Sequence, residues 1–367
     1  MFKSLIKTKP LIIALALSTA AISSQAQAYS YGVTNVGTLG GEYSTAYGLN
    51  DNGDVVGYSS TGSSAQRAFL YSGGVISDIG ITGNTLSVAT GISNNGHIVG
   101  YSDNLAGDKQ AFLYTNGVTE SFGTLGGATS VATAVNNQGQ VTGYFVDSTE
   151  KERAFVYAGG TLTDIGTLGG PSANGYAINN NGAVAGKSYT EGYAQQPAFS
   201  YNGTMTNLGT LGGNVSVGLD INDNGAVVGY SSTDDGTQRA FVYDTLGIND
   251  LGTLGGSSSY AYSINNNGQI VGYSLDENDQ QRAFLYNNGS MTDLNSLIDP
   301  NSGWNLLQAN AINNNGQIAG FGLFNGESRA FLLSISPVPE PEAYAMMLLG
   351  LGLVGYSVRR RKHIQTK

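Results

Sequence analysis

Apolar and polar positions along most of the chain fall into short runs that suit β-strands and are too short for helices. In the first clear example, four runs of 6 or 7 residues follow one another: Ser44 to Asn50, Asp54 to Ser59, Gln66 to Tyr71 and Gly74 to Gly80. Residues that favour turns, mainly Gly, Asn and Ser, separate them. Runs of this length between such turns predict four strands joined by tight connections.

The same unit of four runs recurs seven times. Each copy has an Asn-rich turn that ends in Gly, and these glycines are 43, 43, 43, 43, 43 and 48 residues apart: Gly53, Gly96, Gly139, Gly182, Gly225, Gly268 and Gly316. A second glycine stands four residues after each of them, and an Ala-Phe pair follows in every copy. Repetition at this spacing indicates one supersecondary unit per copy. The second glycines predict close approach of a neighbouring backbone.

Four strands in 43 residues is the size of a propeller blade, and seven is an ordinary number of blades. The run Tyr31 to Gly37 matches a fourth strand that lacks its own blade, while the last copy stops after its third strand at Leu333. We therefore predict an all-β fold, a seven-bladed β-propeller over residues 29–336, in which 31–37 completes the last blade and covers its exposed edge. A solenoid or another stacked array is the alternative.

A pentapeptide, Gly-Thr-Leu-Gly-Gly, connects many of the units. It occupies residues 37–41, 123–127, 166–170, 209–213 and 252–256. Together with the Ala-Phe segments, it resembles the HAF extracellular repeats over about residues 31–333. The second and last copies depart from the pentapeptide, and Arg mostly replaces the His of the family name. The resemblance therefore implies neither His chemistry nor an activity.

The N-terminal end has the layout of a secretory signal peptide. Three lysines among the first nine residues precede an apolar run at 11–21, and Ala26 and Ala28 form the small-x-small pattern that signal peptidase reads. The run is shorter than the roughly 17 residues that an uncleaved membrane anchor needs. We expect export with cleavage after Ala28, so that residues 1–28 are removed.

The C-terminal end has the features of a second targeting signal. Pro339, Glu340 and Pro341 (within 337–342) precede an apolar stretch at 343–358, and Arg359, Arg360 and Arg361 open a basic tail at 359–367. Sixteen helical residues span about 24 Å, so the stretch could cross the membrane with slight mismatch. The basic tail would then stay in the cytoplasm, which places all preceding residues outside.

This order of Pro-Glu-Pro, helix and Arg cluster resembles the PEP-CTERM sorting signal of Gram-negative bacteria. The family implies recognition by an exosortase, transient anchoring in the inner membrane, removal of the tail, and delivery to the cell surface or the exopolysaccharide matrix of a biofilm. A plain C-terminal membrane anchor is the alternative.

Charge and composition limit the partners. The whole chain has a net charge of −10, but residues 29–336 hold 24 acidic and eight basic side chains, a net of −16. Phosphate backbones would repel such a domain, so we expect no nucleic-acid partner, whereas cationic partners or metal ions fit better. The absence of Cys excludes disulfides, Cys-ligated zinc and thiol nucleophiles.

Catalytic candidates are few. His97 and His363 are the only histidines, and His363 falls in the basic tail. His97 follows a turn without any nucleophile-elbow motif, so a Ser-His-Asp triad is disfavoured and a surface strand position is preferred. No spacing singles out a carboxylate pair for glycoside hydrolysis. The sole tryptophan, Trp304, lies in a five-residue insertion before the last unit and is the best lone candidate for a specific contact.

The recurrent acids suggest structural roles. Four Arg–Asp pairs stand 11 residues apart and could face each other across the third and fourth strands: Arg67 and Asp78, Arg153 and Asp164, Arg239 and Asp250, Arg282 and Asp293. Eleven other acids lie in the loops between second and third strands, which should share one face with the Gly-Thr-Leu-Gly-Gly loops. The tyrosines after the Ala-Phe segments, such as Tyr71, are expected to pack rather than to stack on sugars.

Oxygen-rich turns also suggest Ca²⁺. The weak candidate ligands are Asp51, Asp54, Asp234, Asp235, Asp276 and Asp279. No copy completes an EF-hand loop, so turn geometry is the preferred interpretation, and we assign no metal, cofactor or catalytic residue.

Taken together, these features predict an exported, non-enzymatic protein of the cell surface or matrix, with a role in adhesion or matrix organisation. The alternatives are a polysaccharide-binding module that uses the acidic loop face, and a secreted glycan hydrolase or lyase on the same scaffold.

Overall fold

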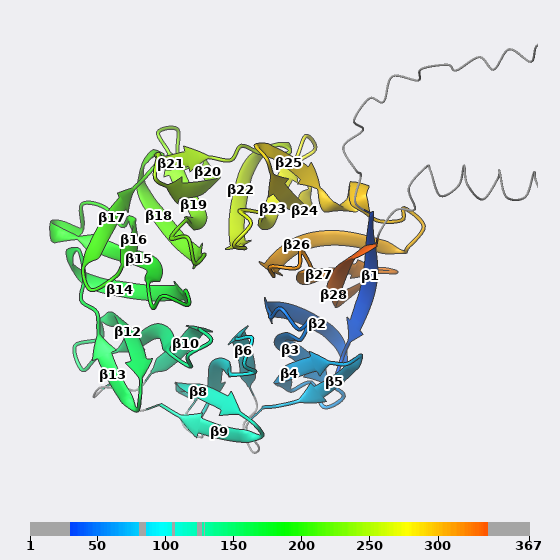
Figure 1. The fold of residues 1–367 in the computed structure, drawn as a ribbon, viewed down its shortest axis with the longest axis horizontal. Helices are drawn as coiled ribbons and strands as arrows, with labels where there is room; N and C mark the ends of the chain where they lie inside the picture. The colour runs from blue at the N-terminus through cyan, green and yellow to red at the C-terminus, as the bar shows by residue number, and fades with distance from the viewer. Residues whose placement is uncertain (1–29, 81–85, 105–106, 123–126, 128, 337–367) are drawn as a thin grey trace, which may run out of the picture. The chain divides into compact units, whose positions relative to one another are not determined.

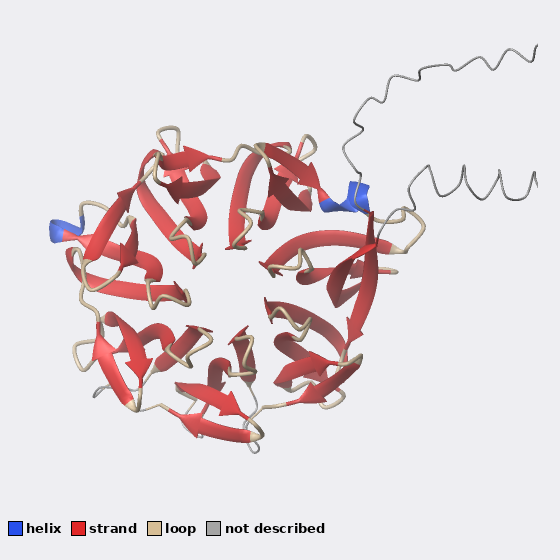
Figure 2. Ribbon diagram, viewed as in Figure 1, coloured by secondary structure: helices blue, strands red, loops and turns tan. Residues whose placement is uncertain are grey.

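The computed structural model describes residues 30–80, 86–104, 107–122, 127 and 129–336. Within these ranges it contains 28 β-strands and two short 3-10 helices, so the all-β prediction is confirmed (Figure 2). The predicted signal peptide, the Pro-Glu-Pro motif, the helix at 343–358 and the basic tail lie outside the described residues. Among the described residues, no helix is long and apolar enough to cross a membrane.

The strands form seven four-stranded antiparallel sheets, one for each repeat (Figure 1). Blades 1 and 2 comprise β2 (Gly40–Leu49), β3 (Val55–Thr61), β4 (Gln66–Ser72), β5 (Val75–Asp78), then β6 (Ser87–Ile92), β7 (Ile98–Asp103), β8 (Lys109–Thr115) and β9 (Val118–Ser121). Blades 3 and 4 comprise β10 (Ser130–Val135), β11 (Val141–Val146), β12 (Glu152–Ala158), β13 (Thr161–Asp164), then β14 (Gly169–Ile178), β15 (Val184–Thr190), β16 (Ala198–Tyr201) and β17 (Met205–Gly209), with η1 (Glu191–Tyr193) between β15 and β16.

Blades 5 and 6 comprise β18 (Gly212–Ile221), β19 (Val227–Thr233), β20 (Gln238–Asp244), β21 (Gly247–Asp250), then β22 (Gly255–Ile264), β23 (Ile270–Asp276), β24 (Gln281–Asn287) and β25 (Ser290–Asp293). Blade 7 follows η2 (Leu294–Leu297) and comprises β26 (Trp304–Ile312), β27 (Ile318–Phe324), β28 (Glu327–Ser336) and the N-terminal strand β1 (Ser30–Gly37).

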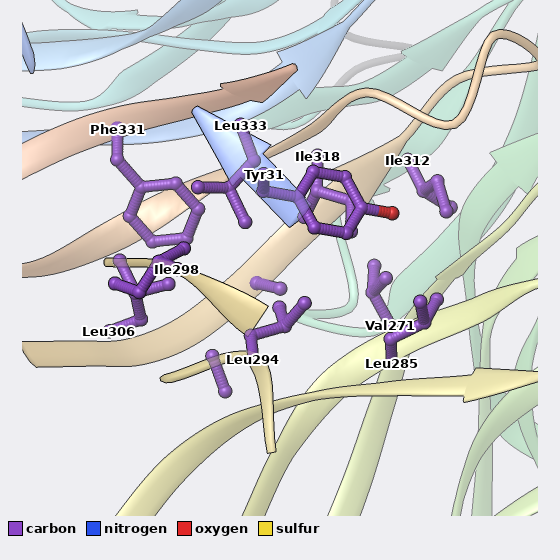
Figure 3. Close-up of a cluster of buried hydrophobic side chains, with 12 residues drawn as sticks. Tyr31, Val271, Leu285, Leu294, Ile298, Leu306, Ile312, Ile318, Phe331 and Leu333 are labelled. Carbon is purple, nitrogen blue, oxygen red and sulfur yellow. The ribbon is translucent and has the colours of Figure 1, made fainter. Parts of the chain in front are cut away.

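The ring is closed by β1, as predicted. It pairs antiparallel with β28, from Ser30 opposite Ser336 to Gly37 opposite Ala330. Tyr31 is only 5% exposed and belongs to the same buried cluster as Leu294 and Leu333 (Figure 3). The two ends of the propeller therefore share one sheet and one core, and the solenoid alternative is wrong.

The hydrophobic cores lie between neighbouring blades. One cluster joins Val56 and Ala68 of blade 1 to Ala89, Ile98 and Phe112 of blade 2. The phenylalanine of every Ala-Phe pair is buried in this way: Phe69, Phe112, Phe155, Phe199, Phe241, Phe284 and Phe331. Full burial of such a side chain stabilises by roughly 1.5–3 kcal/mol, so each repeat needs its neighbour to be stable.

The predicted close approach of a neighbouring backbone is confirmed at the second glycine of each repeat, which is Gly57 in blade 1. A Cβ at Gly57 would overlap the carbonyl oxygen of Thr45 on the innermost strand. The corresponding carbonyl meets the glycine in each other blade as well: Gly100, Gly143, Gly186, Gly229, Gly272 and Gly320. Here the side chain is absent because two backbones touch.

Candidate functional site

The innermost strands of the blades lie around the centre of the ring (Figure 1), and their side chains line a central channel. It contains three successive cavities that share lining residues. A cavity of 160 Å³ lies at the end that carries the Asn-rich turns, one of 200 Å³ lies in the middle, and one of 350 Å³ opens toward the loop face. We call the 350 Å³ cavity the mouth; it is lined by Tyr47, Val88, Thr90, Tyr101, Thr133, Tyr176, Leu219, Tyr262, Gln308 and Asn310.

A bulge in each innermost strand supplies most of this lining. In blade 1 the register shifts between Ala46 and Gly48, which leaves Tyr47 without a partner on β3. The same shift occurs in the other six blades at Thr90, Thr133, Tyr176, Leu219, Tyr262 and Asn310. A bulge re-aims the extra residue, and all seven side chains line the channel. Because these seven positions hold different residues, the mouth breaks the symmetry of the repeats.

Tyrosines from four blades meet at the mouth. Tyr47 lies 5.6 Å from Tyr58 between ring centres, and Tyr262 lies 6.0 Å from Tyr273. Lys109 lies over the ring of Tyr101, with its Nζ 4.7 Å from the ring centre. Although these rings contact one another, Tyr47 remains 38% exposed. The ring of Tyr47 is therefore only partly covered by its neighbours and remains accessible from the cavity.

The tyrosine hydroxyls are neutral at physiological pH, and burial raises their pKa further above it. Burial raises the pKa of Tyr262 to about 12, with a further contribution from Tyr260 and Tyr230. Burial also raises the pKa of Tyr47 and Tyr176 well above the usual range. At any physiological pH these groups can therefore donate and accept hydrogen bonds but carry no charge.

Besides Val88 and Leu219, the rest of the lining is polar, and most of these polar side chains are hydrogen-bonded to the next blade. The Asn310 amide nitrogen donates to the Ala46 carbonyl at 2.7 Å, and its oxygen accepts from Gln308 at 2.7 Å. Thr90 and Thr133 donate to carbonyls of the following blade at 2.8 and 3.1 Å. These bonds fix the side chains at the mouth in place.

Below the mouth the channel narrows around one carboxylate. Asp220 lines the middle cavity, where the equivalent positions hold Gly48, Gly91, Ala134, Ala177, Ser263 and Ala311. Its oxygens accept from Ile221 N at 2.8 Å, Ser263 Oγ at 2.8 Å and Ile264 N at 2.9 Å. Burial outweighs these bonds and raises the pKa of Asp220 above its ordinary value.

At the other end of the channel, the Asn-rich turns form a closed ring of hydrogen bonds. In each turn the backbone N–H of the second residue donates to the side-chain oxygen of the second residue in the next blade, at 2.8–3.0 Å. The members are Asp51, Asn94, Asn137, Asn180, Asp223, Asn266 and Asn314. We call them the asparagine ring. The bond from Asn314 to Asp51 closes it between blades 7 and 1.

The first residue of each turn makes a second set of contacts. Asn50 Oδ1 accepts from the N–H groups of Asn52 and Asp54 at 3.0 and 2.9 Å, which is the turn geometry expected from the sequence. Its Nδ2 donates across to the carbonyl of Ser93 in blade 2 at 3.3 Å. Sequence reasoning explained the turn but missed that its side chains join neighbouring blades.

The predicted Arg–Asp pairs are mostly wrong. Arg67 and Asp78 do pair at 3.2 Å, but Arg153 pairs with Asp147 and Arg282 with Asp276, each at 2.9 Å. The expected Asp164 and Asp250 instead accept from the N–H of the glycine two residues on, at 2.8 Å each, and Asp293 similarly caps η2. A carboxylate beside a tight turn accepts a hydrogen bond from the nearest backbone N–H. Arg153 and Arg282 therefore pair with an aspartate in the loop that precedes their own strand. No ion pair of Arg239 with Asp250 is found in the described part of the chain.

The loop face is arranged as expected. Leu168 of one Gly-Thr-Leu-Gly-Gly segment bridges to Thr190 at the end of β15, where the acidic loop begins, and Leu211 and Leu254 bridge likewise to Thr233 and Asp276 at the ends of β19 and β23. The acids there are bonded locally. Thr149 and Arg153 lower the pKa of Asp147, and Thr233 and Thr237 lower the pKa of Asp235 to about 2.

The weak metal candidates do not converge. Asp51 belongs to the asparagine ring, Asp54 accepts from Asn50, and Asp235 and Asp276 make the contacts just described. Asp279 accepts from Ser257, and Asp234 lies beside Gly212. Among the described residues, no three His, Asp or Glu side chains gather closely enough to hold a metal ion.

His97 and Trp304 have local roles. His97 lies in the turn before β7, at the opposite end of that strand from the acidic loop, and its Nδ1 is 3.3 Å from Ser93 Oγ. Trp304 packs against Phe324 and Phe331, with ring centres 5.1 and 6.0 Å away. The insertion before β26 places Leu294 and Ile298 in the core, so the expected specific contact of Trp304 is a packing contact.

The tyrosines at the mouth were missed by sequence reasoning, while those after the Ala-Phe segments pack as expected. One signal was available: the glycine at 57 and its equivalents is followed by Tyr58, Tyr101, Tyr144, Tyr230 and Tyr273. No local pattern, however, reveals the bulge that turns Tyr47, Tyr176 and Tyr262 inward.

Comparison with known proteins identifies the tail and part of the propeller. Residues 337–362 match the PEP-CTERM protein-sorting motif, and residues 170–332 match a protein of unknown function, DUF3466. The second match covers less than half of the chain. No curated protein matches the sequence significantly.

Solved structures share the fold at low identity. A puromycin-hydrolyzing peptidase of Mycobacterium tuberculosis is 10% identical with a TM-score of 0.51, over 85% of this chain and 57% of that one. YCF48 in complex with D1 peptide is 8% identical with a TM-score of 0.50, over 85% and 97%. TolB of Acinetobacter baumannii is 13% identical with a TM-score of 0.45, and the match spans 77% of this chain and 63% of that protein.

The similarities to the peptidase and to YCF48 show the fold alone, whereas the match of residues 337–362 concerns the destination of the protein. The chain is therefore a seven-bladed β-propeller with a PEP-CTERM signal, which marks an exosortase-sorted, surface-targeted protein of Gram-negative bacteria.

Proposed function

We propose that this protein is a non-catalytic component of the cell surface or exopolysaccharide matrix, with a role in adhesion or matrix organisation. The observation that carries the proposal is the sorting motif at 337–362, which begins one residue after the last propeller strand ends at Ser336. Exosortase would deliver a rigid ring whose loops are available for binding. The HAF-repeat resemblance belongs to this proposal, because repeats of that kind are extracellular.

The arrangement of the acids supports a non-catalytic role. A glycan hydrolase needs two carboxyl groups on one cavity. The 760 Å³ cavity between blades 1 and 7 does hold Glu42 and Glu327, but Glu327 is ion-paired with Arg329 and its side chain is 66% exposed. Such an exposed, ion-paired carboxylate lacks the buried setting of a general acid. Loss of glycan turnover on replacing Glu42 or Glu327 would be needed to support an enzyme.

Sorting is tested by intact mass and C-terminal peptide mapping of protein from the cell surface and the medium. We expect a species that ends near residue 340. In a variant with Pro339→Ala, Glu340→Ala and Pro341→Ala, this species should disappear and full-length protein should accumulate in the inner membrane. A wild-type protein that keeps its tail in the inner membrane would contradict the proposal.

A further inference from the structure

We propose that the mouth binds one neutral saccharide unit, with its ring stacked on Tyr47, Tyr176 and Tyr262. This inference rests on the proposed function, since it names the class of matrix ligand. It differs from the polysaccharide alternative drawn from the sequence, because the site is the mouth of the channel and not the acidic loops.

The size and shape of the mouth suit a small ligand. Its volume of 350 Å³ falls at the lower end of ordinary small-molecule pockets, which begin at about 300 Å³. The three tyrosines come from blades 1, 4 and 6, so they surround the cavity instead of forming one flat patch. A ligand at this position contacts several blades at once, and the stoichiometry should be one per chain.

The chemistry of the lining selects a saccharide. The C–H faces of a pyranose ring pack on aromatic rings, and its hydroxyls need amide and hydroxyl partners at the edge. The mouth provides both, with tyrosine faces beside the amides of Gln308 and Asn310. Since Tyr47 is 38% exposed, the mouth presents aromatic surface to water that a ligand would cover.

Electrostatics favours a neutral ligand. The described residues that line the mouth include no charged side chain. The surrounding domain has a net charge of −16, which disfavours uronic acids, sulfates and phosphates. Lys109 is engaged with Tyr101 at the rim and does not line the cavity.

The test uses mature protein purified from the cell fraction that contains it. A glycan array of neutral and uronic-acid oligosaccharides selects the best neutral binder, and titration calorimetry then measures its affinity and stoichiometry. We expect neutral glycans only, at one per chain. Tyr47→Ala and Tyr262→Ala should each weaken binding about tenfold or more, because aromatic anchors dominate such sites.

Three variants control for folding and for stacking. Tyr193→Ala removes an aromatic side chain that is 64% exposed on the loop after β15 and should bind like the wild type. Tyr47→Phe keeps the ring and should lose less than threefold. Leu219→Trp fills the mouth without removing a tyrosine and should abolish binding, even if an alanine variant fails to fold.

Absence of any neutral glycan binding, or binding that survives both alanine variants and Leu219→Trp, would overturn the site. These outcomes are separable from sorting. Protein that reaches the surface but binds no glycan contradicts only the mouth proposal, whereas glycan binding by protein that keeps its tail contradicts only the surface proposal.

Discussion

Asp220 is an acidic side chain in the middle cavity, at a position where the other six blades hold Gly, Ala or Ser. Its three hydrogen bonds connect blade 5 to Ser263 and Ile264 in blade 6, and Ser263 Oγ in turn accepts from Ile312 N in blade 7 at 3.3 Å. Despite these bonds, burial raises its pKa, so the folded state favours the protonated acid. Its effect on stability is opposite in sign to that of the acids on the loop face.

Asp220→Asn should therefore change the pH dependence of stability. With a raised folded pKa, the contribution of Asp220 to the free energy of unfolding is fully present below the ordinary aspartate pKa of about 3.9 and is lost as pH rises through the folded pKa. The asparagine variant lacks this loss. Relative to wild type, its urea midpoint should rise as the pH increases above about 4.

Asp235→Asn provides the opposite control. The pKa of Asp235 is lowered to about 2, so its carboxylate contributes stability above the unfolded pKa that disappears as pH falls through about 2. The urea midpoint of this variant should be lower than that of the wild type at neutral pH, and the two midpoints should become similar near pH 2. A midpoint difference for Asp220→Asn that stays constant with pH would refute the assignment of the raised pKa.

At the scale of elements, the Asn-rich turns both reverse the chain and connect the blades. Six of the seven first positions hold Asn, whose amide donates to the next blade, but blade 2 holds Ser93. Ser93 is too short to reach the Asn136 carbonyl and bonds to His97 instead. One link of this inner set is therefore missing.

Restoring that link should stabilise the propeller. Ser93→Asn combined with His97→Gln copies the Asn–Gln arrangement of blade 3, where Asn136 bonds both Gln140 and the Asn179 carbonyl. One added hydrogen bond contributes about 0.5–1.5 kcal/mol, measured as an increase in the free energy of urea unfolding. The reverse change, Asn50→Ser, should cost a similar amount. Equal stability of all three proteins would mean that these contacts contribute nothing.

At the scale of the whole molecule, stability depends on closure. The N-terminal strand β1 completes blade 7 by pairing with β28. Blade 7 also contacts blade 1 through the core shared by Val36, Phe69 and Leu332 and through the bond from Ala330 N to Ser44 Oγ at 3.0 Å. Without β1, the strand β28 would present an unpaired edge and part of a hydrophobic cluster to water.

Removing residues 30–37 should therefore lower the thermal midpoint by about 10 °C or more and cause aggregation, measured by calorimetry and size-exclusion chromatography. A synthetic peptide of residues 30–37, added in excess, should restore a monomeric peak because it can pair with β28. A truncated protein that remains monomeric and equally stable would show that closure does not depend on β1.

The sequence alone determined the repeat, the strand order and the closing strand. These features follow from local rules, because every repeat contains the same short apolar runs, the same turn residues and the same spacing between the equivalents of Gly57 and Phe69. The sequence also predicted where the protein is sent, because residues 339–361 form a linear signal whose recognition does not depend on a folded structure.

The site was decided by tertiary structure. Tyr47, Tyr176 and Tyr262 lie more than eighty residues apart in sequence and meet only because the ring closes and a bulge turns each one inward. The partners of Arg153 and Asp220 also depended on which group lay nearest in space. Side-chain direction at an irregular strand position depends on the packing of the blades, which local periodicity does not encode.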